Sequence, residues 1–328
     1  MHVSNLCALL GIEIPIIQAP TGSVAGPELA AAVSSAGGLG SLGVTWTTES
    51  DMLLAIRSIS ESTPNPFLIN YALSFPPNTL VAALDAGVRI VSFSWGDPSQ
   101  LIPVVHARGA LAGVQIGSLA GAKRALDSGA DFLICQGVEA GGHVQSTTGL
   151  FSLLESVVSE LKGRVPVVAA GGLATGQDIA EALIAGASGV MLGTRYVATR
   201  ESRAHDVYKS ALLNAGKDST TLTICFDGGW PHAPHRVLRN STFETWEASG
   251  CPQPGSRPGE GDVIGSSNGS DIWRYEDTAP RTNMIGNLEA MAMYAGTGVE
   301  RIQDLPGAFD LTRSLWAEAQ AALATLHI

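Results

Sequence analysis

Short apolar runs alternate with helical patterns along the first two thirds of the chain. Each run is four to six residues long, and together they are rich in valine, isoleucine, leucine and phenylalanine. Runs that are apolar at successive positions are typical of strands covered on both faces, as in a parallel sheet. The eight predicted strands are Pro15–Ala19, Leu39–Gly43, Phe67–Tyr71, Ile90–Phe93, Leu111–Gln115, Phe132–Gln136, Val165–Ala170 and Gly189–Leu192.

Between these runs, apolar residues recur at spacings of three and four, which is the pattern of a helix with one buried face. The predicted helices are Pro27–Ala36, Asp51–Ile59, Thr79–Ala86, Ser99–Ala107, Leu119–Ser128, Leu150–Leu161 and Gln177–Ala185. Several of them are followed by glycine, which supplies the left-handed conformation that ends a helix. Eight strands in alternation with helices predict an α/β fold, a (β/α)8 barrel of the TIM type.

A doubly wound open sheet is the main alternative to the barrel. That fold places a G-x-G-x-x-G turn directly after its first strand. Here the first strand is followed by Ala19-Pro20-Thr21-Gly22-Ser23, which does not match the turn. The barrel is therefore favoured.

The alternation stops after about Ala204, and the following segment has three tryptophans, a loop rich in Gly, Pro and Ser, and no strong strand run. Helical periodicity returns at Asn287–Ala295 and at Leu311–Leu326, and we expect the last helix to pack back on the barrel. We therefore expect a barrel domain over residues 1–205, completed by C-terminal helices over 287–328. A smaller, mostly helical lid domain is expected to be inserted at 206–286, over the barrel mouth.

Composition narrows the class of protein. Of the 328 residues, 45% are hydrophobic and 15% are charged, which excludes a disordered chain. No apolar run approaches the roughly 18 residues of a membrane span. The formal net charge is −11 without any basic cluster, so the electrostatic attraction that underlies nucleic-acid binding is missing. We expect neither a membrane nor a nucleic acid as a partner.

The N-terminus and the cysteines bear on the compartment. The first twelve residues lack the pattern of a signal peptide, and the four cysteines lie far apart with no C-x-x-C pair. Both observations favour a reducing compartment, and we expect a cytoplasmic protein. The sequence leaves the oligomeric state open, with a homodimer as one option.

Polar residues and glycines collect at the C-terminal ends of the predicted strands, where TIM barrels carry their active sites. Packing gives no reason for glutamine, asparagine or glycine at so many of these ends. The set comprises Gln18-Ala19-Pro20-Thr21-Gly22, Asn70, Gln115, the segment from Gln136 to His143, Ala170-Gly171-Gly172 and Gly193-Thr194. We therefore expect the functional site at this end of the barrel.

Two of these ends are expected to form a phosphate site. Gly171-Gly172 follows the seventh predicted strand, and Gly193-Thr194 follows the eighth. Loops at these two positions recurrently bind phosphate in this fold. Glycine lets backbone N–H groups approach the phosphate oxygens, and a helix N-terminus favours the anion. Alternatively, these glycines only turn tight corners between strand and helix.

A glycine-rich loop carries one histidine after the sixth predicted strand. The loop reads Gln136-Gly137-Val138-Glu139-Ala140-Gly141-Gly142-His143. An imidazole titrates near neutral pH, so it can act there as a base or as a cationic hydrogen-bond donor. A loop histidine can equally be structural, but its position after two glycines at a strand end favours a functional role.

With these motifs, the sequence resembles the nitronate monooxygenase family, formerly called 2-nitropropane dioxygenases, which are FMN-dependent TIM barrels. The most specific mark is the Gln-Gly-x-Glu-x-Gly-Gly-His string that ends at His143. Further marks are Pro15–Pro20, Ala36–Gly40, Pro166–Gly172, Gly189–Arg195, Phe226–Pro231 and His235–Asn240. One departure is Thr21, where many members have methionine beside the flavin.

The resemblance implies that FMN lies across the barrel mouth and that His143 is the catalytic residue. It places the phosphate at the two glycine loops, the flavin ring near Pro20-Thr21-Gly22, and the three amide side chains near ring or ribityl atoms. The cofactor-binding residues that it implies are Ala19, Pro20, Thr21, Gly22, Asn70, Gln115, Gln136, Gly141, Gly142, Ala170, Gly171, Gly172, Gly193 and Thr194.

The reaction that the resemblance implies is the oxidation of an alkyl nitronate, or of a neutral nitroalkane, by O2 to a carbonyl compound and nitrite. His143 would take the α-proton of a nitroalkane, or hold an anionic nitronate as a hydrogen-bond donor. Two other functions stay open. One is an NAD(P)H-dependent FMN reductase of the enoyl-acyl-carrier-protein or quinone reductase type, and the other is a non-catalytic, flavin-binding regulatory barrel.

Two further signals are interpreted as structural. His232 and His235 have an H-x-x-H spacing, but prolines at 231 and 234 preclude the helix that would put both rings on one face. No third ligand is evident, so we expect no metal site. The tryptophans of the inserted segment are interpreted as lid core rather than as substrate contacts; they are Trp230, Trp246 and Trp273.

Overall fold

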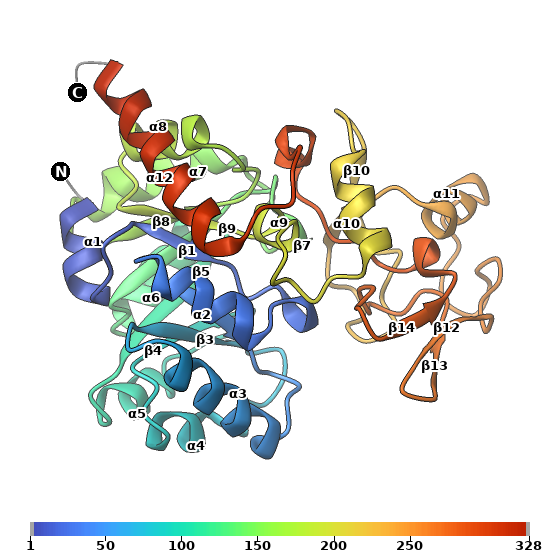
Figure 1. The fold of residues 1–328 in the computed structure, drawn as a ribbon, viewed down its shortest axis with the longest axis horizontal. Helices are drawn as coiled ribbons and strands as arrows, with labels where there is room; N and C mark the ends of the chain where they lie inside the picture. Colours follow the sequence, from blue (N-terminus) through green and yellow to red (C-terminus); the bar gives the residue numbers. More distant parts are fainter. Residues whose placement is uncertain (1–2, 326–328) are drawn as a thin grey trace.

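The computed structural model describes residues 3–325 and shows a barrel of eight parallel strands (Figure 1). The strands are β1 (Ile16–Gln18), β2 (Gly40–Gly43), β3 (Phe67–Ala72), β4 (Ile90–Ser94), β5 (Leu111–Ile116), β6 (Phe132–Gln136), β8 (Val167–Ala170) and β9 (Gly189–Leu192). Their order is β1-β9-β8-β6-β5-β4-β3-β2, and a parallel bridge between Ile17 and Leu39 joins the two edges. All eight predicted strands are confirmed, and so is the TIM-type barrel.

Helices cover the outside of the barrel between consecutive strands. They are α2 (Pro27–Ser35), α3 (Glu49–Ser62), α4 (Leu80–Asp85), α5 (Ile102–His106), α6 (Leu119–Asp127), α7 (Leu150–Leu161) and α8 (Gly176–Ile184). Their apolar faces pack on the outer faces of the strands in the largest core cluster, which includes Leu29, Ile56 and Leu154. The seven predicted helices are confirmed, with ends that differ by a few residues.

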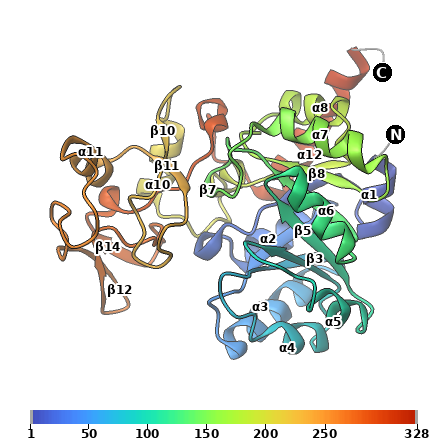
Figure 2. The same ribbon diagram turned by 180° about the vertical axis from the view of Figure 1, so that it is seen from behind.

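Two terminal helices complete the barrel. Helix α1 (Val3–Leu10), which the sequence pattern did not predict, closes the N-terminal end of the barrel, where Leu6 and Leu10 pack with Phe132. Helix α12 (Ala308–Thr325) packs against α8 and α2, so the expected packing of the last helix on the barrel is confirmed. The predicted end of this helix, at position 326, lies outside the described residues. Figure 2 shows that α1 and the C-terminal end of α12 lie on the side of the barrel away from residues 206–286.

The segment from 206 to 286 is not mostly helical, contrary to the sequence prediction. It holds two helices, α10 (Asp206–Leu213) and α11 (Ser241–Ala248), and five strands, β10 (Thr220–Thr223), β11 (His235–Leu238), β12 (Val263–Ser267), β13 (Ser270–Trp273) and β14 (Met284–Gly286). These strands are short and partly exposed, so they lack the continuous apolar runs that mark the barrel strands. The segment stands beside the barrel in both views (Figures 1 and 2).

The prediction of a helix over Asn287–Ala295 is also wrong. Only Leu288–Ala290 forms a short 3-10 helix, and the chain then runs without helix to Gly296. We call residues 291–298 the strap. Its backbone is held from the side, because Leu238 N donates to Met293 O at 2.8 Å and the Asn240 amide donates to Met291 O at 2.8 Å. Its apolar residues are buried on several sides, so their helical spacing does not mark one face of a helix.

Replacing Gly40 with alanine should destabilise the barrel. A Cβ atom at this first residue of β2 would lie 1.9 Å from Ala30 O in the backbone of α2, so helix and strand would have to move apart. Overpacking of this kind costs about 1–3 kcal/mol. We expect a lower midpoint of thermal unfolding for Gly40→Ala. The control is Gly216→Ala, because a Cβ there meets no atom within 4 Å; equal midpoints for both variants would contradict the packing argument.

Candidate active site

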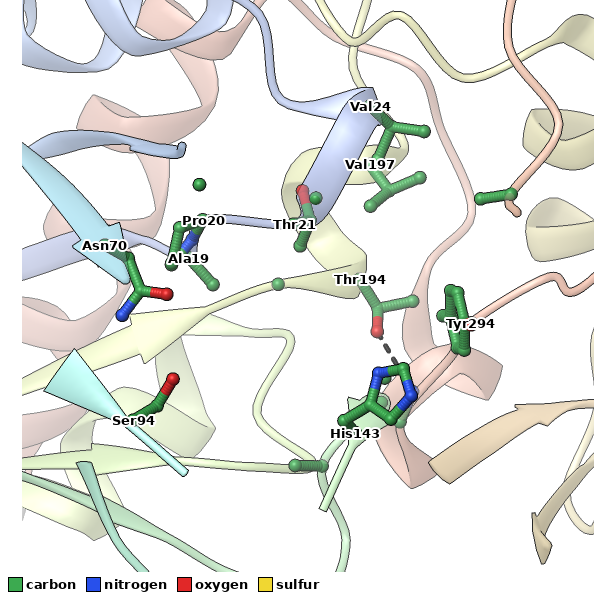
Figure 3. A pocket seen from close by; sticks show the side chains of 18 of the residues that line it. Ala19, Pro20, Thr21, Val24, Asn70, Ser94, His143, Thr194, Val197 and Tyr294 are labelled. Atoms are coloured by element: carbon green, nitrogen blue, oxygen red, sulfur yellow. Dashed lines mark hydrogen bonds between the residues drawn. The ribbon is translucent and has the colours of Figure 1, made fainter. Parts of the chain in front are cut away.

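A cavity of about 510 Å³ lies at the C-terminal ends of the barrel strands. All fifteen residues that were expected to be catalytic or to bind the cofactor line it, and Figure 3 shows several of them around the open space, whereas Gln18 of the strand-end set does not line the cavity. They are Ala19, Pro20, Thr21, Gly22, Asn70, Gln115, Gln136, Gly141, Gly142, His143, Ala170, Gly171, Gly172, Gly193 and Thr194. The volume is in the usual range of small-molecule and cofactor sites.

Bare backbone forms the cavity wall at the ends of β8 and β9. Gly171 and Gly172 have φ angles of +120° and +72°, a region that side chains rarely allow. A Cβ on Gly172 would lie 2.9 Å from Glu139 Cβ and 2.9 Å from Thr297 Oγ1. Gly193 differs, because a Cβ there would only reach 3.4 Å from Thr21 Cγ2. The protein has room for a methyl group at Gly193, so the absence of a side chain there leaves that space to the cavity.

The three amide side chains of the cavity are not equivalent. Asn70 Nδ2 donates to Ser92 Oγ at 2.9 Å, and Gln115 Nε2 donates to Gln145 Oε1 at 2.9 Å. Gln136 is used at both ends, since its Nε2 donates to His143 O at 3.1 Å and its Oε1 accepts from Gln145 N at 2.9 Å. Gln136 therefore holds the loop that carries His143, whereas the side-chain oxygens Asn70 Oδ1 and Gln115 Oε1 make no hydrogen bond among the described residues.

A two-residue strand, β7 (Gly142–His143), fixes the backbone of the histidine. It pairs antiparallel with β11, which places His143 opposite His235 and Gly142 opposite Arg236. The Arg236 guanidinium donates from Nη2 to Val138 O at 3.0 Å, at the start of the same loop. On the other side, a Cβ at Gly141 would lie 2.5 Å from Gly296 N of the strap. The loop is thus held between β11 and the strap.

The His143 ring lies in an aromatic environment and has no hydrogen-bond partner for Nε2 among the described residues. It stacks on Trp230 with ring centroids 4.3 Å apart, and Trp95, His235 and Tyr294 surround it at 6.2, 5.4 and 5.7 Å. Burial, and then the repulsion that a protonated His235 would exert, lower the pKa of His143 to about 3. The imidazole is therefore neutral at physiological pH, and its buried Nε2 is left for a ligand.

His235 is held in a neutral form by the backbone. Its Nδ1 lies 2.9 Å from Ala233 O, which requires a hydrogen on Nδ1, and its Nε2 accepts from Phe226 N at 3.2 Å. Burial lowers the pKa of His235 as well. Because both nitrogens are used, His235 does not bind a ligand and instead supports the face of His143.

Several cavity residues were not expected from the sequence. Trp46 follows β2 and Trp95 follows β4, so their positions after strand ends could have marked them as cavity residues. Trp95 also has a φ angle of +61°, which is strained for a bulky residue. Trp230, interpreted as lid core, lines the cavity, whereas Trp246 packs in a separate core cluster. The inserted segment and the strap add Asp277, Arg281 and Tyr294.

Two negative observations apply to the described residues. Within residues 3–325, no group of three or more His, Cys, Asp or Glu side chains is arranged to hold a metal ion. Over the same range, no helix has the length and apolar character needed to cross a membrane.

The family model described as nitronate monooxygenase matches residues 3–80 and 77–318, which is nearly the whole chain. The protein belongs to the nitronate monooxygenase family. It is therefore an oxidoreductase of a flavin-dependent family, and its TIM barrel is the fold of that family.

Curated relatives match the chain almost from end to end. A nitronate monooxygenase from Pseudomonas aeruginosa is 31% identical, covering 94% of this chain and 97% of its own. A protein from Mycobacterium tuberculosis is 32% identical over 98% of this chain and 97% of its own. It is named (3aS,4S,5R,7aS)-5-hydroxy-7a-methyl-1-oxo-octahydro-1H-indene-4-carboxyl-CoA dehydrogenase.

Solved structures of similar sequence share the fold over the same length. FabK from Thermotoga maritima superposes with a TM-score of 0.82 at 27% identity, covering 98% of this chain and 97% of its own. The nitroalkane oxidase from Streptomyces ansochromogenes gives a TM-score of 0.79 at 29% identity, covering 98% and 99%. Full-length relatives of this chain thus carry the names of different enzymes.

Because the ring of His143 is buried, we predict that it stays neutral at pH values well below 6.5. The unfolded chain takes up this proton near pH 6.5, but the folded chain takes it up only near pH 3. This difference destabilises the folded state as the pH falls between these values. Histidine ring ¹⁵N shifts of the flavin-free protein should show a ring that stays neutral to about pH 4, and the loss of its signal in His143→Gln distinguishes it from His235, whose pKa is also lowered. A His143 signal that titrates near pH 6.5 would contradict the burial argument.

Proposed function

We propose that this family member oxidises alkyl nitronates with O2 to carbonyl compounds and nitrite, with FMN as its cofactor. The observation that carries the proposal is the neutral, unpartnered Nε2 of His143 in the same cavity as the bare backbone at Gly171, Gly172 and Gly193. Relatives named nitronate monooxygenase at about 30% identity support it.

The cavity has the chemistry that a flavin mononucleotide requires. The glycine loops after β8 and β9 offer a place for a phosphate, which backbone N–H groups can approach closely. Thr21 Oγ1 is buried in the cavity wall without a hydrogen-bond partner among the described residues, as expected of a group that a ligand satisfies. The free carbonyl oxygens of Asn70 and Gln115 would accept from the polar part of the cofactor. Bound there, FMN would supply electron acceptance and the reaction with O2.

His143 is better suited to hold an anion than to remove a proton. With a pKa of about 3, protonating this imidazole costs about 5 kcal/mol more than protonating a solvated one. A neutral nitroalkane requires a base for its α-proton, so it is the less favourable substrate. A nitronate has already lost that proton, and a neutral imidazole with its hydrogen on Nε2 can donate directly to the anionic nitro group.

Aromatic side chains line the cavity beside this hydrogen bond. We call Trp46, Phe75, Trp95 and Trp230 the aromatic wall, whose rings are in edge contact at centroid distances of 4.9 to 5.9 Å. With Trp230 stacked on the imidazole, the donor lies in a region of low polarity, where a hydrogen bond to an anion is stronger than in water. Trp230 comes from the inserted segment, which supports our proposal that residues 206–286 act as a lid or substrate unit on the barrel of residues 1–205 and 287–328.

Gly193→Ala should weaken FMN binding without unfolding the protein. The new methyl group would make only ordinary contacts with Thr21 and Ala19, but it would occupy the space proposed for the phosphate. Forcing an extra methyl group into a packed contact costs about 1–3 kcal/mol, which corresponds to a dissociation constant for FMN roughly tenfold or more higher. Fluorescence titration of the apoprotein with FMN measures this dissociation constant, and Gly216→Ala is the control. Unchanged affinity would place the phosphate elsewhere.

His143→Ala should keep FMN bound and lose most turnover. Removing one preorganised donor to a developing or bound anion lowers kcat by roughly 100-fold or more. Nitrite release and O2 consumption with propane-2-nitronate measure this effect. His106→Ala is the matched control, since His106 is exposed on α5 and pairs with Asp131 outside the cavity. Nitrite release by His143→Ala at the rate of the control would refute the proposed role.

A second candidate function is supported by the coenzyme A dehydrogenase name of a full-length relative. In that case the bound flavin would exchange electrons with NADH or NADPH, as in the reductases of the enoyl-acyl-carrier-protein or quinone type. Mixing the holoenzyme anaerobically with each nucleotide separates the two functions. Rapid loss of the oxidised flavin absorbance would favour the reductase, and the absence of that loss together with nitrite release favours the nitronate oxidase.

A further inference from the structure

Three consecutive backbone N–H groups after β8 make no hydrogen bond within residues 3–325. They belong to Gly171, Gly172 and Leu173, all of which line the cavity. We call these three residues the nest. Successive N–H groups in such a turn make a concave site for an anion, and polar groups in a cavity wall are normally satisfied by a partner. The nest is therefore part of the place proposed for the FMN phosphate.

One side chain holds the nest from outside the cavity. Arg301 Nη2 donates to Gly172 O at 2.6 Å, and Arg301 itself does not line the cavity. Because a trans peptide is planar, the C=O of Gly172 and the N–H of Leu173 point in opposite directions. The hydrogen bond therefore turns the Leu173 N–H away from Arg301. A charged donor on the carbonyl also polarises this peptide, which makes its N–H a stronger donor.

Arg301 is fixed by a carboxylate that also holds the backbone next to the nest. Its Nε donates to Asp178 Oδ2 at 3.2 Å. The same oxygen accepts from Ala174 N at 2.8 Å and from Thr175 N at 2.9 Å, directly before α8. Since the charge of Arg301 is paired with that of Asp178, we expect Arg301 to act through the orientation of the peptide more than through net charge.

The contact requires a glycine at the end of the strap. A Cβ on Gly298 would lie 2.2 Å from Gly172 O and 3.0 Å from Arg301 Nη2, so a side chain there would displace the carbonyl or the guanidinium. Arg301 ends the short 3-10 helix Thr297–Arg301, which begins in the strap. The strap thus carries the guanidinium to the back of the nest.

We propose that Arg301 is a positioning residue for the cofactor: from outside the cavity it orients the peptide between Gly172 and Leu173 so that the nest binds the phosphate of FMN. The inference rests on the proposed function, from which it takes the cofactor, but it does not depend on the molecule that is oxidised. Without the guanidinium, this peptide loses the bond that sets its direction. The loss falls on the phosphate alone, because the amide groups proposed for the rest of the flavin, Asn70 and Gln115, come from other strands.

The test compares FMN with riboflavin, which lacks only the phosphate. Fluorescence titration of the apoprotein gives the dissociation constant of each flavin for wild-type protein, Arg301→Gln, Arg301→Lys and the control Arg108→Gln. Arg108 is matched to Arg301, because it pairs with Asp85 at 2.9 Å, donates to Val104 O, and has a side chain 33% exposed against 39%. It precedes β5, at the N-terminal end of the strands, and does not line the cavity.

We expect Arg301→Gln to raise the dissociation constant of FMN about tenfold, as the loss of a charge-assisted hydrogen bond allows, and to leave that of riboflavin unchanged. Arg301→Lys should recover part of the FMN affinity, since an ammonium can donate to Gly172 O but lacks the fork that reaches Asp178 as well. If Arg301→Gln does not fold, Arg301→Lys carries the same comparison with a smaller effect. Arg108→Gln should bind both flavins as the wild type does.

A second measurement uses the holoenzyme. The ³¹P resonance of bound FMN reports the hydrogen bonds of its phosphate, so it should shift in Arg301→Gln and stay in place in Arg108→Gln. A purely structural role of Arg301 would weaken FMN and riboflavin equally, and that result would overturn the inference. Unchanged FMN affinity or an unchanged ³¹P resonance in Arg301→Gln would overturn it as well.

Failure of the proposed function gives different results. Wild-type protein that binds riboflavin as tightly as FMN does not recognise a phosphate, which refutes the proposed cofactor and the inference together. A holoenzyme that binds FMN but releases no nitrite from nitronates fails only as a nitronate oxidase. The flavin titrations and the ³¹P resonance then still decide the role of Arg301, because neither measurement depends on turnover.

Discussion

The pairing of β7 with β11 is the interaction on which the site depends. It consists of two residue pairs, His143 with His235 and Gly142 with Arg236, yet it joins a barrel loop to the inserted segment. Without it, a loop with three glycines in eight residues would have little to fix its conformation, because glycine is the most permissive residue. The pairing also brings Trp230 and His235 to the histidine, so the same contact that positions the ring determines its protonation state.

Bare backbone is the second requirement of this arrangement. The strap can approach the histidine loop only because Gly141 and Gly296 lack side chains, and a Cβ on Gly298 would lie 2.2 Å from Gly172 O. Thr297 N then donates to Glu139 O at 3.0 Å, and Gly296 N donates to Thr194 Oγ1 at 3.0 Å. Three loops of the barrel mouth are therefore connected through the strap, which joins the barrel ends to the cavity wall by hydrogen bonds as well as by buried apolar residues such as Met293 and Ala295.

The sequence predicted the barrel and the barrel-side part of the site because both depend on local patterns. Buried parallel strands are continuous apolar runs, and strand ends in this fold meet at one place, so residues as distant as Asn70 and Gly193 could be grouped in advance. The strap was missed because Met291 and Ala295, with Leu288 before them, are buried residues at the three- and four-residue spacing of a helix face. Trp230 and Arg281 were missed because their place depends on tertiary packing of short strands with no marked periodicity.

This difference explains why relatives of the same family carry names for different reactions. The barrel ends supply backbone and amide groups that suit a flavin, and these follow from the fold itself. The side chains that a substrate would meet come from elsewhere: Trp230 and Arg281 from the inserted segment, and Trp46 and Trp95 from loops whose conformation is not dictated by the strands. We therefore infer that fold and family determine the chemistry available to a flavin in this cavity, whereas the shape and polarity of the wall opposite the barrel select the substrate.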